Sequence, residues 1–424
     1  MNLQAASKDQ LSAWEQELSA AYRTAQGKKL NLDLTRGKPS AEQLSLANAL
    51  DGILNGDYSA NGVDVRNYGG LDGLPEVRKL GAEIMDVPVE NVLAGGNSSL
   101  TLMHQTVLVA AYFGLQGEAS AWHNKGTMKF LCPVPGYDRH FSVCEHMGIE
   151  MVTAPMTATG PDMDQVEKMI AEDANIVGMW CVPKYSNPTG VVYSDDTVQR
   201  IAKLAKIAGE GFRVFWDNAY AVHDLVDEPV ALASIHEASI AAGTEDSVIQ
   251  FASTSKITFA GAGVAFMAAS ESNLKGIKHA LSFMTIGPDK VNQLRHVKFF
   301  SENGALQAHM KKHAAIIKPR FASVLDHLQA AFGDSELGKW ESPEGGYFIS
   351  FDTLPGLAKD VVRMAGEAGV KLTPAGATFP YGKDPQDSNI RIAPTVPTVE
   401  QVDAAMEIFV LCVKLASVRQ ALAK

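Results

Sequence analysis

One lysine of this sequence stands where its charge is difficult to solvate. Lys256 lies in the stretch STSKITF (253–259), directly after the apolar run at 248–251. A lysine removed from water loses its proton more readily, and a neutral amine can attack a carbonyl carbon. The residue is therefore either a side chain that snorkels from a strand end to water or the covalent anchor of an aldehyde.

A carboxylate and an arginine mark two further apolar segments. FRVFWDNAY (212–220) places Asp217 at the end of a strand-like run, with Tyr220 close behind. Asp217 can cap a following helix, or it can hold a protonated ring nitrogen. NIRIAP (389–394) places Arg391 between apolar neighbours, where a guanidinium requires an acidic partner from the protein or from a substrate.

Two turn sequences are also candidates for binding. ENVLAGGNSSL (90–100) joins a strand to a helix through Gly96, Asn97 and Ser98. Free N–H groups at such a junction suit an anion such as phosphate, but an Asn or Ser N-cap explains them equally. CVPKYSNPTG (181–190) ends in a segment with Asn187, and Asn-Pro and Thr-Gly favour turns in any case.

The elements that must position these residues alternate along the chain from about residue 73. Strand-like runs alternate with helical patterns such as DDTVQRIAKLAKIAG (195–209), and this alternation predicts an α/β fold with a mostly parallel sheet. The expected strands are ENVLAGG, TMKFLCPVP, IEMVTAP, NIVGMWCVP, FRVFWDNA and SVIQFAS. Ligands of such sheets bind beyond the carboxyl ends of the strands, where the candidate residues fall.

The domain organisation is expected to be a large domain and a small one, because 424 residues exceed what one core usually serves. Residues 1–45 are predicted to form an N-terminal arm, with a helix at 8–26, that joins the small domain. Residues 46–300 are predicted to form the large domain. Residues 301–424 form the predicted α+β small domain, with a long helix at 302–332 and a closing helix at 399–422.

Composition excludes several classes of function. The formal net charge of −11 argues against nucleic acid or an anionic membrane as the main partner. The 4 cysteines have no metal-ligand spacing, so we expect no metal site and a reducing compartment. No stretch approaches the apolar run of about 20 residues that a membrane span needs, and no secretory signal is visible. We therefore expect a soluble cytoplasmic protein.

Taken in order, these motifs resemble those of the class I aminotransferases, which are pyridoxal-phosphate (PLP) enzymes of fold type I. The likeness covers nearly the whole chain and rests on LTRGKPS, YGGLDGLPEVR, AGGNSSL, PGYDRH, NPTG, DNAY, STSK and NIRIAP. The nearest branch looks like the aspartate-aminotransferase-like proteins related to the effector domains of MocR regulators. No winged-helix domain precedes this chain, which disfavours a regulatory function. The resemblance implies a large domain with a mostly parallel, seven-stranded type of sheet.

The resemblance also implies a role for each residue around the cofactor ring. Lys256 would form the imine with the cofactor and then act as general base and acid. Asp217 would pair with the pyridinium nitrogen. Tyr220 and Asn187 would hydrogen-bond the phenolic oxygen, and Tyr137 would stack on the ring.

The remaining implied roles concern the phosphate and the substrate. Arg391 would bind the substrate α-carboxylate in a bidentate manner, with the backbone of Gly37 beside it. Tyr68 would reach the phosphate of a neighbouring subunit in a homodimer. The phosphate would otherwise be held by Gly96, Asn97, Ser98, Ser253 and Ser255.

One position departs from the family pattern. Many class I enzymes carry an arginine eight residues after the lysine that pairs with the phosphate, and Val264 stands there instead. Either neutral donors and a helix dipole hold the phosphate, or another cation replaces the arginine.

The expected reaction is transamination from aspartate or glutamate to a 2-oxo acid such as 2-oxoglutarate. A carboxylate clamp in the ring plane favours proton loss from Cα over decarboxylation. A carbon–sulfur lyase and a non-catalytic PLP-binding regulator are the alternatives. The distal carboxylate of a dicarboxylic substrate needs a second cation, and the sequence leaves the choice open among Arg36, Lys38, Lys184 and Arg295.

Overall fold

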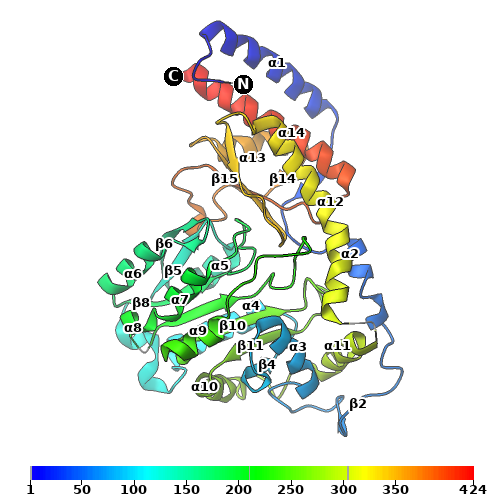
Figure 1. The fold of residues 1–424 in the computed structure, drawn as a ribbon, viewed down its shortest axis with the longest axis vertical. Coiled ribbons are helices and arrows are strands. Elements are labelled where there is room, and N and C mark those ends of the chain that lie inside the picture. Colours follow the sequence, from blue (N-terminus) through cyan, green and yellow to red (C-terminus); the bar gives the residue numbers. More distant parts are fainter. Residues whose placement is uncertain (1, 210, 303–304) are drawn as a thin grey trace.

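A mixed sheet of eight strands forms the centre of the molecule (Figure 1). The computed structural model describes residues 2–209, 211–302 and 305–424. The sheet order is β4-β11-β10-β9-β8-β5-β6-β7. Its strands are β4 (Val92–Ala94), β5 (Lys129–Val134), β6 (Glu150–Thr157), β7 (Gly160–Pro161), β8 (Ile176–Cys181), β9 (Arg213–Asp217), β10 (Val248–Ser253) and β11 (Ala265–Ala269).

The strand directions confirm the expected mostly parallel α/β sheet. β10, β9, β8, β5 and β6 pair in parallel, whereas β11 runs antiparallel to both of its neighbours. The seven strands that the family pattern implied are extended by the two-residue strand β7, which forms a hairpin with β6. β11 is not among the strands expected from the sequence, because its run AFMAA is short and follows a glycine-rich turn.

Helices cover both faces of this sheet, as continuous burial of its central strands requires. Alternate residues of β11 show the two faces, since Phe266 packs with Val77 on one side and Met267 packs with Met103 on the other. The helices of this part are α3 (Pro75–Met85), α4 (Ser99–Tyr112), α5 (Asp138–His146), α6 (Met163–Glu172), α7 (Asp195–Ala202), α8 (Ala205–Ala208), α9 (Ile235–Ala242), α10 (Glu271–Leu281) and α11 (Lys290–Glu302). A small hairpin, β2 (Ser59–Ala60) and β3 (Val63–Asp64), precedes them.

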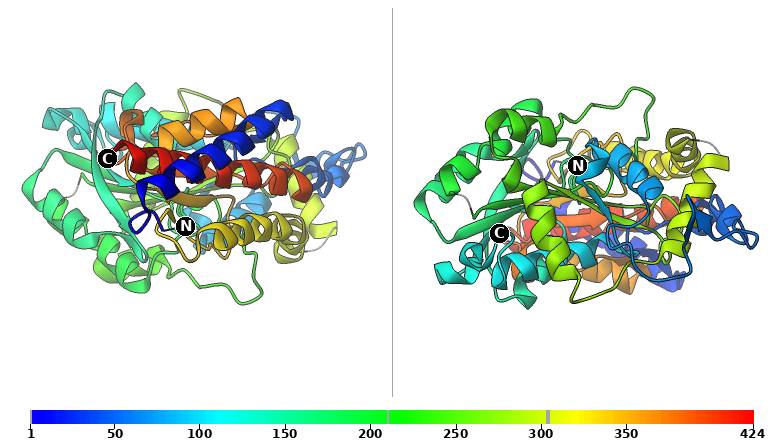
Figure 2. Two further views of the ribbon diagram at one scale, coloured as in Figure 1. Left: turned by 90° about the horizontal axis from the view of Figure 1, so that it is seen from above. Right: turned by 90° about the horizontal axis from the view of Figure 1, so that it is seen from below.

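A second core combines the two ends of the chain. The antiparallel sheet of β12 (Gly338–Trp340), β13 (Ile349–Thr353) and β15 (Asn389–Ile392) packs with α13 (Ala358–Glu367) and α14 (Val399–Ala423). From the N-terminal segment, β1 (Leu32–Leu34) pairs with β14 (Val370–Leu372), and α1 (Lys8–Gly27) lies along α14 (Figure 2). The N-terminal segment thus packs with the C-terminal part of the chain.

One long helix connects the two cores. α12 (Leu306–Phe332) runs between the two parts of the fold (Figure 1). It packs Met310 with the core of the large sheet and Ile317 and Phe321 with the second core. It begins at Leu306 rather than at the expected residue 302, because α11 occupies the preceding segment. The division into 1–45, 46–300 and 301–424 stays a prediction. Within the described residues, no helix is long and apolar enough to span a bilayer.

The close packing of the large sheet predicts the effect of one added methyl group. Gly178 lies in β8, where an added Cβ would stand 2.2 Å from Cζ of Phe130. We expect Gly178→Ala to lower the free energy of unfolding by about 1–3 kcal/mol, measured by denaturant titration. Gly366→Ala is the matched control, because that position in α13 faces open space. The control should leave stability unchanged or raise it by up to about 1 kcal/mol, and equal losses in both variants would contradict the packing argument.

Candidate active site

A cavity of about 430 Å³ lies beyond the carboxyl ends of β9 and β10, against the second core. It brings together eight residues that were expected at the site from the sequence, from parts of the chain that are far apart. Those eight are Arg36, Gly37, Lys38, Tyr137, Asn187, Tyr220, Lys256 and Arg391. Segments that meet only in the tertiary structure therefore build one site.

Lys256 lines this cavity directly after β10. Its amine lies 4.8 Å from the ring centroid of Tyr220, and its side chain is half-buried. Desolvation lowers the pKa of Lys256, while the charge of Asp217 raises it. The amine therefore gives up its proton more easily than a surface lysine does, and it points into the cavity instead of snorkelling outward.

Asp217 is the last residue of β9, and one of its oxygens has no partner. Oδ2 lies 3.0 Å from Nε2 of His140, but Oδ1 is buried and accepts no hydrogen bond from any described residue. The interpretation of Asp217 as a helix N-cap is wrong, since the next helix, α9, begins at Ile235. An unpaired buried carboxylate oxygen is costly, and the proton of a ring nitrogen would satisfy it.

His140 is a functional candidate that the sequence analysis missed. It lies on α5 within PGYDRH, from which only Tyr137 had been selected. Its ring stacks on Trp180 at a centroid distance of 4.3 Å and meets the Tyr137 ring edge-on at 4.9 Å. These contacts hold the imidazole against Asp217. No sequence pattern signals the pair, because it depends on how α5 packs against the sheet.

Arg391 lies on β15 and has both a protein partner and a free donor. Nη1 donates to Oδ1 of Asp138 and to Oδ1 of Asn187, each at 3.1 Å, and the guanidinium stacks 4.7 Å over the Phe348 ring. Nε is buried and has no partner among the described residues. Asp138 therefore supplies the acidic partner that the sequence required, while a donor stays open to a second carboxylate.

Gly37 allows the N-terminal segment to pack directly against Phe348, the ring on which Arg391 stacks. A Cβ at residue 37 would lie 2.4 Å from Cζ of Phe348, so only glycine lets the backbone approach that ring. The same loop brings Arg36 and Lys38 to the cavity wall.

The residues expected to bind phosphate also meet, although they lie outside the cavity lining. Oγ of Ser255 donates to the carbonyl of Asn97 at 3.2 Å, and Nδ2 of Asn97 donates to the carbonyl of Gly261 at 3.2 Å. Ser98 is the N-cap of α4 and makes no side-chain capping bond. Gly96, Asn97 and Ser98 line a hollow of about 280 Å³ of their own. The N–H groups at the start of α4 and the hydroxyl of Ser255 thus form one polar corner with Ser253.

Two positions considered for phosphate binding, Val264 and Tyr68, supply no group to this site of their own chain. Val264 is buried in an apolar core, so that position supplies no charge. Tyr68 is 81% exposed and does not line the cavity of its own chain.

Two of the four cations considered for a distal carboxylate lie at the cavity wall. Arg36 and Lys38 line the cavity, as does Arg139, which the sequence analysis did not consider. Lys184 instead pairs with Oδ1 of Asp224 at 2.7 Å, away from the lining. Arg295 is likewise not part of the lining.

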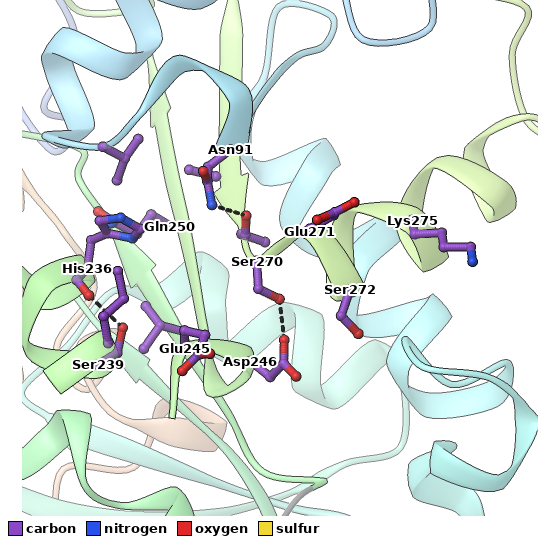
Figure 3. A pocket seen from close by; sticks show the side chains of 15 residues that line it. Asn91, His236, Ser239, Glu245, Asp246, Gln250, Ser270, Glu271, Ser272 and Lys275 are labelled. Carbon is purple, nitrogen blue, oxygen red and sulfur yellow. Dashed lines mark hydrogen bonds between the residues drawn. The ribbon is translucent and has the colours of Figure 1, made fainter. Parts of the chain in front are cut away.

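A larger hollow of about 750 Å³ lies at the opposite ends of β10 and β11 (Figure 3). Two of its polar side chains have partners within the hollow, since Ser270 donates to Asp246 and Asn91 donates to the backbone carbonyl of Ala269. Of the described residues that line it, none belongs to the predicted site. Lys256, Tyr220 and Arg391 line the smaller cavity instead.

Comparison with known proteins identifies the family. The family model described as aspartate amino-transferase matches residues 6–424. An aspartate aminotransferase from Corynebacterium glutamicum is 43% identical over 419 residues, which cover 98% of this chain and 96% of that protein. The crystal structure of an aspartate transaminase from the same species matches with a TM-score of 0.95 and 42% identity, over 99% of both chains.

The likeness to a more distant structure is evidence for the fold alone. An α-aminoadipate aminotransferase from Thermus thermophilus, complexed with N-(5'-phosphopyridoxyl)-L-leucine, gives a TM-score of 0.75 at 21% identity, covering 92% of this chain and 93% of that one. The likeness to MocR effector domains stays a prediction. The fold, the cavity and these matches together show that the chain is an aminotransferase of fold type I and belongs to the aspartate amino-transferase family.

Proposed function

We propose that this aminotransferase uses PLP to transfer the amino group of aspartate or glutamate to a 2-oxo acid such as 2-oxoglutarate. The observation that carries the proposal is a desolvated amine and a half-satisfied guanidinium at one cavity, with the amine within reach of the charge of Asp217, whose Oδ1 is buried without a partner among the described residues. The name of the C. glutamicum relative supports the choice of aspartate. The cytoplasmic location stays a prediction from the sequence.

The residues present fit PLP at this site. Lys256 would hold its aldehyde carbon and Oδ1 of Asp217 its ring nitrogen, which would supply the missing donor. Tyr137 would cover the ring, and the polar corner of Ser98 and Ser255 would receive the phosphate. When bound, the cofactor supplies an electron sink for the carbanion at the substrate Cα. Because Val264 is apolar and buried, the phosphate would depend on neutral donors and the α4 dipole.

The residues of the chain would move and hold protons around that carbon. The lowered pKa of Lys256 lets its amine accept a proton from the substrate Cα and return it. Burial raises the pKa of Tyr220, so its hydroxyl stays protonated and available as a donor. Arg391 would orient the substrate by offering Nε to the α-carboxylate.

Three exposed cations support a dicarboxylic substrate. Arg36 and Lys38 come from the N-terminal loop and Arg139 from α5. All three are exposed residues that line the cavity, whereas Arg391, which also lines it, is buried. A second carboxylate would be attracted to this rim while the first is bound by Arg391. A carbon–sulfur lyase would require no such second charge.

The role of Lys256 gives a prediction for the proposed function. We expect Lys256→Ala to lose covalent PLP attachment and at least about a thousandfold of kcat, because proton transfer and the covalent anchor disappear together. Visible spectroscopy with L-aspartate, followed by 2-oxoglutarate, should convert the wild-type cofactor band and then restore it. Full activity in the variant would contradict the assignment. Release of pyruvate from a β-substituted alanine without amino transfer would instead favour the lyase.

Substrate choice gives the second prediction. Replacing Arg36, Lys38 and Arg139 singly by Met should raise KM for aspartate by about tenfold in at least one variant, with KM for alanine unchanged. Met keeps much of the side-chain bulk and removes the charge. Lys184→Met is the matched control, because Lys184 is paired away from the cavity. Equal KM values for aspartate in the three variants and the wild type would exclude a distal-carboxylate role for the rim.

An exposed apolar patch supports the proposed homodimer. Tyr68, Phe283 and Ile286 are 81%, 79% and 66% exposed. Their segments are adjacent, since a Cβ at Gly287 would lie 2.5 Å from the carbonyl oxygen of Gly69. Such a patch is typical of a surface that a second copy covers, and it would carry Tyr68 toward the partner's phosphate corner.

The patch gives the third prediction for this site. Light scattering should show a dimer for the wild type, and Phe283→Asp with Ile286→Asp should yield a monomer of low activity. Phe113→Asp is the control, because Phe113 is also an exposed aromatic residue (59%) but belongs to a different segment, just after α4. An active wild-type monomer would exclude shared sites.

A further inference from the structure

The backbone carbonyl oxygens of Lys256 and Ile257 accept hydrogen bonds from side chains rather than from backbone groups. The Lys256 carbonyl accepts from the hydroxyl of Tyr347 at 3.3 Å. The Ile257 carbonyl lies 2.7 Å from Nε2 of His309 and 2.9 Å from Nε2 of His313. Neither oxygen accepts a backbone hydrogen bond from the part of the chain that the structure describes. The conformation of the lysine backbone therefore depends on these side-chain donors.

Gln43 determines which nitrogen of His313 carries the proton. Oε1 of Gln43 accepts from the backbone N–H of Ser40 at 3.0 Å, which identifies Nε2 as its donor. That Nε2 lies 3.1 Å from Nδ1 of His313, so Nδ1 is an acceptor and the proton is on the imidazole Nε2. Desolvation lowers the pKa of His313 to about 4, which keeps the ring neutral. His313 then donates to the Ile257 carbonyl.

The same amide also directs Tyr347. Nε2 of Gln43 donates to the Tyr347 oxygen at 2.9 Å, so the Tyr347 hydroxyl proton is free for the Lys256 carbonyl. The next residue, Phe348, packs under Arg391 and against the loop at Gly37. One amide thus connects the backbone of the lysine with the wall of the substrate clamp.

The three side chains come from separate elements and are deeply buried. Gln43 is on α2 (Ala41–Ser45), His313 is on α12 and Tyr347 precedes β13, with exposed fractions of 0%, 1% and 0%. A buried network of this kind rigidifies a structure only when each member is satisfied. Here each donor has an acceptor, and the chain of donors ends at the residue that carries the reactive amine.

We propose that Gln43, His313 and Tyr347 are positioning residues that fix the Lys256–Ile257 backbone and so aim the Lys256 amine into the cavity. This inference rests on the proposed function of Lys256. It assigns the short N-terminal helix α2 a part in the chemistry, although α2 contributes no side chain to the cavity lining.

The test uses the full-length protein, stripped of cofactor and reconstituted with PLP. In Tyr347→Phe and Gln43→Met, the rate of covalent attachment and kcat should each fall about tenfold, because the amine is displaced from its attacking position. KM for aspartate and the affinity for pyridoxamine phosphate, which forms no bond to Lys256, should change by less than about twofold. The double variant should match the worse single variant, because both act through one chain of donors.

Tyr22→Phe is the matched control. It also removes a buried tyrosine hydroxyl, which donates to the Met364 carbonyl at 2.9 Å in the second core. The midpoint temperature of thermal unfolding should fall by a similar amount in Tyr22→Phe and Tyr347→Phe. Only Tyr347→Phe should slow the covalent attachment of PLP to Lys256. His223 Nε2 lies 3.4 Å from the Lys256 carbonyl and should leave Tyr347→Phe partly active.

The outcomes separate this inference from the proposed function. Wild-type protein that attaches PLP at Lys256, with unslowed variants or an equally slow Tyr22→Phe, would overturn the positioning role alone. Wild-type protein without any attachment at Lys256 would overturn the proposed function and this inference together.

Discussion

The desolvation of one amine beside a buried carboxylate is the constraint on which the site depends. Lys256 is poorly solvated, which lowers its pKa, and the charge of Asp217 acts in the opposite direction. Leaving Oδ1 of Asp217 buried without a partner costs on the order of 1–3 kcal/mol or more for a charged group. Such a cost persists only where the surrounding fold enforces it, and a ligand that donates a proton to that oxygen would remove it.

The fold keeps the Asp217 carboxylate buried near Lys256 because two parallel strands, β9 and β10, end at the same edge of the sheet. Adjacent pairing of β9 and β10 places Asp217 and the segment before Lys256 side by side, since Phe251 is the register partner of Asp217. α5 then brings His140 to the second oxygen of the carboxylate, and the stack with Trp180 prevents the imidazole from turning away. The strand order, more than any single contact, sets the distance between amine and carboxylate.

The second core completes the site from the other side. β15 brings Arg391, and the N-terminal loop at Gly37 closes against Phe348. α12 belongs to both cores, so the helix that carries His313 also fixes how the two parts of the chain meet. Catalytic geometry and the packing of the two cores are consequently parts of one arrangement.

The amino-acid sequence predicted the fold class, six of the strands of the large sheet and eight of the residues that line the cavity. It could do so because apolar periodicity is a local property, and because Lys256, Asp217 and Arg391 each break an apolar run. It did not reveal β11, whose short run has no distinctive period, or the start of α12 at Leu306. It also missed His140, Arg139 and Gln43.

These three residues look like ordinary surface or helix residues in the sequence. Only the tertiary structure brings His140 and Gln43 to their partners, because the stacking of α5 against the sheet places His140, and Gln43 meets His313 across 270 positions of chain. The structure also left Tyr68 away from its own cavity and removed Lys184 from the possible partners of a distal carboxylate. Contacts between distant segments depend on how buried surfaces pack, and no local pattern of residues encodes that packing.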